Sequence, residues 1–164
     1  MVIKQIGIST LMLVLAILSG CKEEQVLAVG APAPDLAVMN AHEQQMTLQQ
    51  VRGKPVVVEF WSSTCGACLV MMKAWQKYAD DHPGKMQFIG VGIEPHPENL
   101  TDFAAQLGVT LPLGLDQLGI TQERYQVIAT PTTFFIDRHG VLKIIHLGYS
   151  SGMDLDHYVN LIQE

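Results

Sequence analysis

Cys65 and Cys68, two cysteines separated by two residues, are the side chains of this 164-residue sequence best able to do chemistry. Such a pair can form a reversible disulfide or supply half of a zinc site, and the spacing can also arise by chance. The chain has three cysteines, and no two of its six histidines have the H-x3-5-H spacing. A four-ligand zinc site is therefore disfavoured, and we predict no metal here.

The two cysteines lie between a predicted strand and a predicted helix. Residues 54–60, KPVVVEF, form a continuous apolar run that is typical of a strand covered on both faces. Residues 67–81, ACLVMMKAWQKYADD, repeat apolar side chains at helical spacing and end before a His-Pro-Gly segment. Cys65 should therefore sit at the helix N-terminus, where free N–H groups and the helix dipole favour a thiolate. We expect Cys65 to attack a disulfide and Cys68, deeper on the same face, to resolve the mixed disulfide.

Glu59 lies near the end of the predicted strand, six residues before Cys65. If its carboxylate is buried there, the loss of hydration raises its pKa and lets it accept the Cys68 proton near neutral pH. The alternative is that Glu59 faces solvent and only ends the strand, since buried carboxylates are uncommon.

The rest of the chain alternates between strand and helix patterns. We predict the following elements: a strand over 86–93, a helix over 99–108, an extended segment over 109–116, a weaker helix over 116–127, a hairpin of 132–137 and 141–148, and a last helix over about 151–162. Ser150 or Ser151 is the expected N-cap of the last helix. This order indicates one α/β domain with a mixed sheet flanked by helices.

The N-terminus has the pattern of an export signal. Lys4 precedes an uncharged apolar run, residues 6–18, which is shorter than the roughly 20 residues that span a bilayer. We therefore predict a signal peptide over residues 1–20, which favours a disulfide between Cys65 and Cys68 in an oxidising compartment. Cleavage would remove one of the 10 Lys and Arg residues and none of the 16 Asp and Glu residues. The acidic balance argues against nucleic acid as the main partner.

The end of the apolar run, LSGC at residues 18–21, resembles the lipobox of bacterial lipoproteins. The resemblance implies that Cys21 is lipidated and becomes the first residue of the mature chain. Residues 22–34 combine charge with Gly and Pro, so we expect residues 21–34 to form the lipidated N-terminus and tether and residues 35–164 to form the domain. Two alternatives stay open: an uncleaved anchor helix, or ordinary cleavage that leaves Cys21 as a free thiol.

Two segments resemble the thioredoxin family. Residues 59–68, EFWSSTCGAC, carry an acid six positions and a Trp four positions before the first cysteine, as the thioredoxin active-site segment does. Residues 129–134, ATPTTF, resemble the cis-proline loop of that family. The resemblance implies that Pro131 is cis and packs against the cysteines, which leaves the backbone of Thr130 free to pair with a substrate strand.

Further segments resemble a subgroup, the membrane-tethered TlpA/ResA-type reductases, over nearly all of residues 29–164. They are VGAPAPDLAV, LQQVRGKPVVVEFW, PTTFFIDRHGVL and an extra strand and helix between residues 86 and 107. The resemblance implies a thioredoxin-like fold with a central strand–helix insert, no cofactor, and a membrane-anchored lipoprotein with its domain on the periplasmic or extracytoplasmic side. The implied partners are disulfides of exported proteins, such as apocytochrome c, and a membrane thiol electron donor.

Three residues depart from the subgroup pattern. Thr64 replaces the usual Trp before the first cysteine, which alters the surface that meets the substrate. Ala67 replaces the commoner Pro between the cysteines, where the residue type affects the reduction potential. Lys73 replaces a helix-kinking Pro, so we expect a straighter helix.

Two other functions stay open. In a thiol peroxidase, the pattern P-x-x-x-[TS]-x-x-C would place Pro at position 58, where this chain has Val58, although Ser62 fits. A copper-binding chaperone of related fold would use both thiols and a distant His, but those proteins have three residues between their cysteines.

Overall fold

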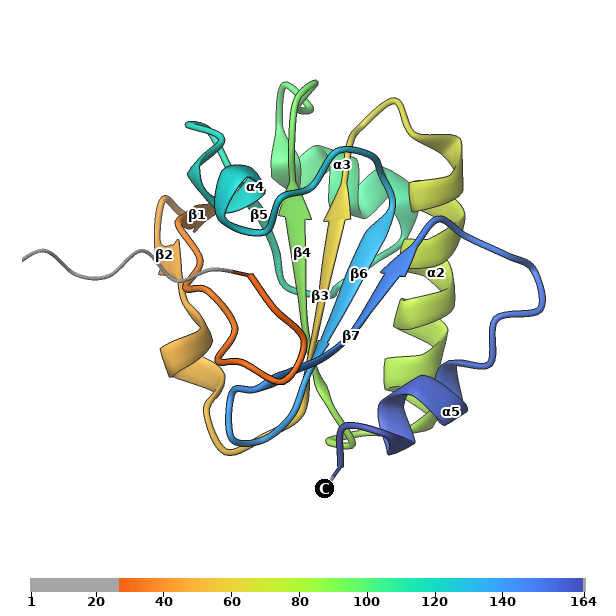
Figure 1. The fold of residues 1–164 in the computed structure, drawn as a ribbon. Helices are drawn as coiled ribbons and strands as arrows, with labels where there is room; N and C mark the ends of the chain where they lie inside the picture. The colour runs from red at the N-terminus through yellow and green to blue at the C-terminus, as the bar shows by residue number, and fades with distance from the viewer. Residues whose placement is uncertain (1–26, 164) are drawn as a thin grey trace, which may run out of the picture.

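This computed structural model describes residues 27–163, which contain both strands and helices (Figure 1). The predicted signal peptide, Cys21 and the first part of the tether lie outside the described residues. The elements are β1 (Val38–Asn40), β2 (Gln45–Met46), the 3-10 helix η1 (Leu48–Val51), β3 (Val56–Trp61), α2 (Gly66–Asp81), β4 (Gln87–Gly92), α3 (Leu100–Leu107), β5 (Leu113–Leu115), α4 (Ile120–Arg124), β6 (Thr132–Ile136), β7 (Leu142–Leu147) and α5 (Leu155–Asn160).

Within the described residues, the strands form one mixed sheet in the order β2-β1-β5-β4-β3-β6-β7. The three central strands β5, β4 and β3 are parallel, and every other neighbouring pair is antiparallel. All six residues of β3 are buried, as its continuous apolar run predicts for a central strand. The expected mixed sheet flanked by helices is therefore confirmed.

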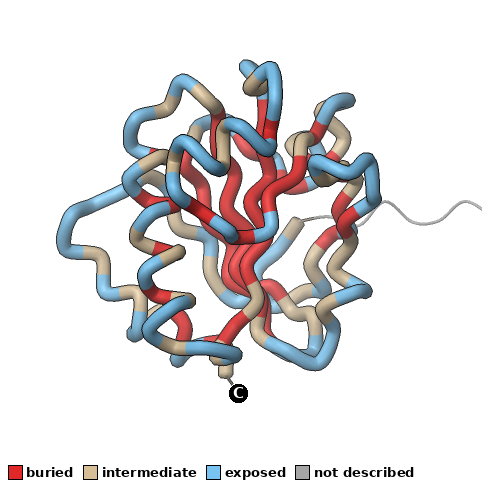
Figure 2. The backbone as a smooth tube through the Cα atoms, turned by 180° about the vertical axis from the view of Figure 1, so that it is seen from behind, coloured by how far each residue is buried: buried red, intermediate tan, exposed pale blue. Residues whose placement is uncertain are grey.

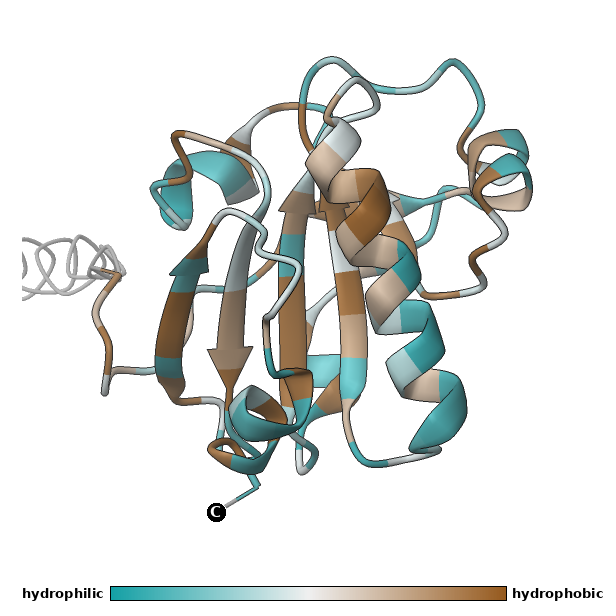
Figure 3. Ribbon diagram, turned by 90° about the vertical axis from the view of Figure 1, so that its right-hand side faces the viewer, coloured by the Kyte–Doolittle hydropathy of each residue, from teal (hydrophilic) through white to brown (hydrophobic). Residues whose placement is uncertain are grey.

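Helices cover both faces of the sheet. One face packs against α2, α3 and α5, with Trp75 of α2 at the centre of that core. The other face packs against α4 and the segment before β1, around Phe60, Tyr125 and Phe134. Figure 2 shows the buried strands between exposed outer segments. Figure 3 shows apolar strands behind α2, whose visible surface also carries polar residues.

Two helices differ from their predicted bounds. The last helix begins at Leu155 instead of about residue 151, because the carboxylate of Asp154 accepts a hydrogen bond from the N–H of His157 and caps it. Neither Ser150 nor Ser151 is the N-cap. The helix predicted over 116–127 is limited to α4, since Gly119 before it and Gln126 after it have positive φ angles.

The segment from Leu27 to Pro34 lies against the hairpin of β6 and β7. The N–H of Gly30 donates to the carbonyl of Leu142, and the N–H of Leu142 donates to the carbonyl of Ala31. The sequence predicts this segment as the end of the tether, and in the structure it is hydrogen-bonded to the domain. No helix within residues 27–163 is long and apolar enough to cross a membrane.

Candidate active site

Cys65 and Cys68 lie where β3 ends and α2 begins, at the upper end of the sheet in Figure 1. They form a disulfide with their Cα atoms 5.2 Å apart. Cys65 is the N-cap of α2, and its Sγ accepts the backbone N–H of Cys68 at 3.2 Å. Cys68 is fully buried, whereas Cys65 is partly exposed. A substrate can therefore reach Cys65 but not Cys68.

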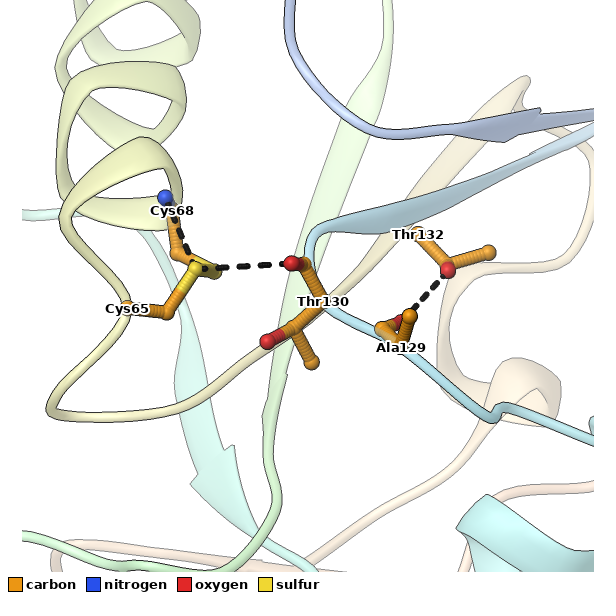
Figure 4. The surroundings of a disulfide bond; sticks show 5 residues. All are labelled: Cys65, Cys68, Ala129, Thr130 and Thr132. Carbon is orange, nitrogen blue, oxygen red and sulfur yellow. Dashed lines mark hydrogen bonds between the residues drawn. A yellow bond between two sulfur atoms is a disulfide. The ribbon is translucent and has the colours of Figure 1, made fainter.

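The loop before β6 lies directly beside the disulfide (Figure 4). The peptide bond between Thr130 and Pro131 is cis. The carbonyl oxygen of Thr130 lies 3.6 Å from the Sγ of Cys65. Among the described residues, neither the N–H nor the C=O of Thr130 makes a backbone–backbone hydrogen bond. The hydroxyl of Thr132 donates to the carbonyl of Ala129 at 2.7 Å and holds the loop in place.

A second loop braces the turn before Cys65, and the sequence patterns did not reveal it. The carbonyl of Pro95 accepts hydrogen bonds from both the N–H and the hydroxyl of Ser63, at 3.2 and 2.7 Å. The bond between Glu94 and Pro95 is also cis. Residues 94–99, EPHPEN, contain two X-Pro pairs that could have drawn attention to this loop, but they do not indicate where the loop packs.

Glu59 is fully buried on β3, so the solvent-facing alternative is wrong. Side chains alternate along a strand, which places Glu59 on the same face as Val57 and Trp61, the face that α2 covers. Desolvation raises the pKa of Glu59 well above its usual value, and the indole of Trp75 opposes this rise in part. Even so, both carboxylate oxygens lack a partner within hydrogen-bonding distance and angle.

The three residues that depart from the subgroup pattern are all exposed, and two of them are next to the disulfide in the chain. Thr64 and Ala67 are exposed next to it, so their side chains face any approaching substrate. Lys73 is exposed on α2, which runs without interruption from Gly66 to Asp81. Within residues 27–163, no group of three or more His, Cys, Asp or Glu side chains could hold a metal ion.

A comparison with protein-family models matches residues 29–145 of this chain to the AhpC/TSA family. The chain belongs to the AhpC/TSA family. The matched region contains Glu59, both cysteines and Pro131, so it includes the whole of the candidate site.

Individual curated proteins are similar to this chain over most of its length. The thioredoxin-like protein YneN of Bacillus subtilis is 28% identical over 143 residues, which cover 85% of this chain and 84% of YneN. The thiol-disulfide oxidoreductase ResA of Geobacillus thermodenitrificans is 28% identical over 142 residues, which cover 86% of this chain and 82% of ResA.

A solved structure is also similar to this chain over most of its length. A crystal structure from Chlorobium tepidum, assigned as a thiol:disulfide interchange protein DsbE, matches with a TM-score of 0.75 and 26% identity, over 83% of this chain and 98% of that one. Together, these matches confirm the expected thioredoxin-like fold and the expected enzyme class, a thiol-disulfide oxidoreductase.

Proposed function

We propose that this thiol-disulfide oxidoreductase reduces disulfides of exported proteins through a cycle of Cys65 and Cys68. One observation carries the proposal. A partly exposed sulfur caps a helix beside a backbone segment, Thr130, that has no backbone partner of its own. This arrangement offers a nucleophile and an edge for an extended substrate at the same place.

The first step is the attack of the Cys65 thiolate on a substrate disulfide. The attack forms a mixed disulfide and releases one substrate sulfur as a thiolate. The N–H of Cys68, which points at the Cys65 sulfur in the structure, would donate to the thiolate and stabilise it. The N–H and C=O of Thr130, which have no backbone partner, would pair with the substrate backbone next to the reacting bond.

The second step is the attack of Cys68 on the Cys65 sulfur of the mixed disulfide. Cys68 must first lose its proton in a place that water does not reach, and we assign Glu59 as the acceptor because its raised pKa suits proton uptake near neutral pH. The attack forms the Cys65–Cys68 disulfide and releases the second substrate sulfur as a thiolate. Two electrons have then passed from the protein to the substrate.

The cycle needs a donor that returns two electrons to the pair, and we propose a membrane thiol protein for that role. The lipobox-like sequence before Cys21 supports a lipid anchor that would hold the domain on the extracytoplasmic side, close to such a donor. Apocytochrome c and other exported proteins with paired cysteines are the proposed substrates.

Trapping of the mixed disulfide tests this function. In Cys68→Ser the second step cannot occur, so a disulfide-bonded substrate peptide should remain attached to the protein through Cys65 and add its mass in non-reducing analysis. The matched control Cys65→Ser should form no adduct, because buried Cys68 cannot reach the substrate. The proposal fails if reduced, folded Cys68→Ser forms no adduct at Cys65.

A further inference from the structure

Most of the buried polar atoms that lack a hydrogen-bond partner belong to residues in the core between the sheet and α2. Within residues 27–163, six buried side-chain oxygen or nitrogen atoms have no partner. Five of the six belong to four residues, which are Glu59, Trp61, Trp75 and Thr133. Folded proteins rarely leave such groups unpaired, so four such residues in one core call for a specific explanation.

Thr133 lies directly opposite Glu59. The two residues are cross-strand partners in the antiparallel pair of β3 and β6, and side chains at such positions have Cβ atoms about 4.5–5.5 Å apart. Both residues are fully buried, and alternation from Phe135 places Thr133 on the face that α2 covers. The Thr133 hydroxyl has no other partner, so it is free to turn toward the carboxylate.

Trp75 of α2 lies in the same core as Val57 and Trp61, and its indole opposes the rise in the pKa of Glu59. Its side chain is fully buried, and its indole N–H also has no partner within hydrogen-bonding geometry. The ring is held by contacts with Tyr78, Phe88 and Phe135, so its N–H has a fixed direction. An indole N–H can only donate, which suits an ionised carboxylate.

We propose that the Trp75 indole N–H and the Thr133 hydroxyl are positioning donors that bind the carboxylate of Glu59 when it is ionised. The proposal rests on the proposed role of Glu59 as proton acceptor and explains how a carboxylate can form there at all. Burial favours the neutral acid, whereas donors favour the charged form. The balance between the two sets the pH at which Glu59 can take the proton of Cys68.

No charged side chain of the described elements pairs with Glu59. The partner of Glu59 on β4 is Gly90, and α2 contributes Cys68, whose sulfur is in the disulfide. In the other direction, His146 of β7 is the cross-strand partner of Thr133. Its Nδ1 lies 3.2 Å from the hydroxyl of Tyr158. Neutral donors are therefore the groups placed to stabilise the carboxylate.

The test is a titration of oxidised protein, in which no catalysis occurs. The Glu59 carboxyl carbon is followed by NMR against pH, together with the indole N–H signal of Trp75. The chain has two tryptophans, so Trp61→Phe assigns the signals. We expect the Trp75 signal to follow the Glu59 titration in the wild type and to be insensitive to pH in Glu59→Gln.

Removal of either donor should raise the pH at the midpoint of the Glu59 titration, because the charged carboxylate loses a hydrogen bond. In Thr133→Val, which keeps the shape, and in Trp75→Phe, we expect a rise of about one pH unit, the size that corresponds to one hydrogen bond to a charged group. Thr133→Ser should restore the wild-type midpoint. Two matched controls remove a hydroxyl elsewhere. Thr121→Val removes a buried hydroxyl on the other side of the sheet, and Tyr78→Phe removes one about a turn from Trp75. Both should leave the midpoint unchanged.

An unchanged midpoint in folded Thr133→Val and Trp75→Phe would overturn the inference. This result is distinct from failure of the proposed function, which is scored by adduct formation in Cys68→Ser and by loss of turnover in Glu59→Gln. A third result is also informative. If the Glu59 titration shifts in the donor variants but Glu59→Gln keeps its turnover, the donors are supported and Glu59 is rejected as the proton acceptor.

Discussion

Glu59 places a carboxyl group in the apolar core between β3 and α2, where its ionised form loses hydration that the structure does not replace with a counter-ion. Sequence alone indicated the position, because the acid falls six residues before Cys65 at the end of a buried strand. Sequence could not indicate the proposed donors, since Trp75 belongs to α2 and Thr133 to β6, the strand that pairs with β3 at Glu59. Their roles depend on tertiary contacts that no local pattern encodes.

Burial of Glu59 predicts a pH-dependent stability. The folded-state pKa lies above the usual value of 4.5, so between these two values the folded protein binds more protons than the unfolded chain. The free energy of unfolding therefore falls as pH rises through this window, by about 1.4 kcal/mol for each pH unit of difference in pKa. Glu59→Gln removes the titration, so we expect it to be more stable than the wild type above the window and to lose that advantage near pH 4.

Urea unfolding of both proteins at a series of pH values measures this effect. The exposed residue Glu98 supplies a control, Glu98→Gln, which should follow the wild-type pH dependence. A constant difference in unfolding free energy between Glu59→Gln and the wild type at all pH values would show that Glu59 does not titrate differently in the folded protein.

Among the elements, β3 and α2 were the most predictable. A continuous apolar run and a helical repeat are strong local signals, and the observed bounds differ from the predicted ones by one or two residues. The last helix was less predictable, because Ser150, Ser151 and Asp154 are all residue types that cap helices. Which of them caps α5 depends on where Val159 and Ile162 meet the core.

The cap of α5 can be tested by comparing two alanine variants. Asp154→Ala removes the oxygen that accepts the N–H of His157, so it should lower the free energy of unfolding by about 1 kcal/mol. Ser151→Ala should change it by no more than a few tenths, since Ser151 lies in the preceding turn. Thermal or urea unfolding decides between them, and a larger loss in Ser151→Ala would contradict the observed helix start.

For the whole molecule, the α/β order predicted the fold class, whereas the strand order and the bracing of the active-site turn by Pro95 came only from the structure. Sheet order is set by long-range packing, and a proline-rich loop gives no local signal of its contact. The proposed N-terminal anchor rests on sequence alone, because residues 1–26 lie outside the described residues.

Cys21→Ser tests that anchor in cells that export the protein. We expect the wild type to fractionate with membranes and to carry acyl chains at Cys21, each buried methylene adding about 0.8 kcal/mol to membrane binding. The variant should lose the acyl mass and leave the membrane fraction. Membrane retention of unacylated Cys21→Ser would instead favour the apolar run at residues 6–18 as an uncleaved anchor.

The reduction potential of the Cys65–Cys68 pair tests the central claim, that this enzyme donates electrons to disulfides, most directly. The protein is equilibrated in redox buffers, free thiols are alkylated, and the reduced fraction is read by mass. The account predicts a low, thioredoxin-like potential of about −270 mV, at which the dithiol is a reductant. A value close to that of a strong oxidant, about −120 mV, would contradict the reductase and indicate a protein that forms or rearranges disulfides.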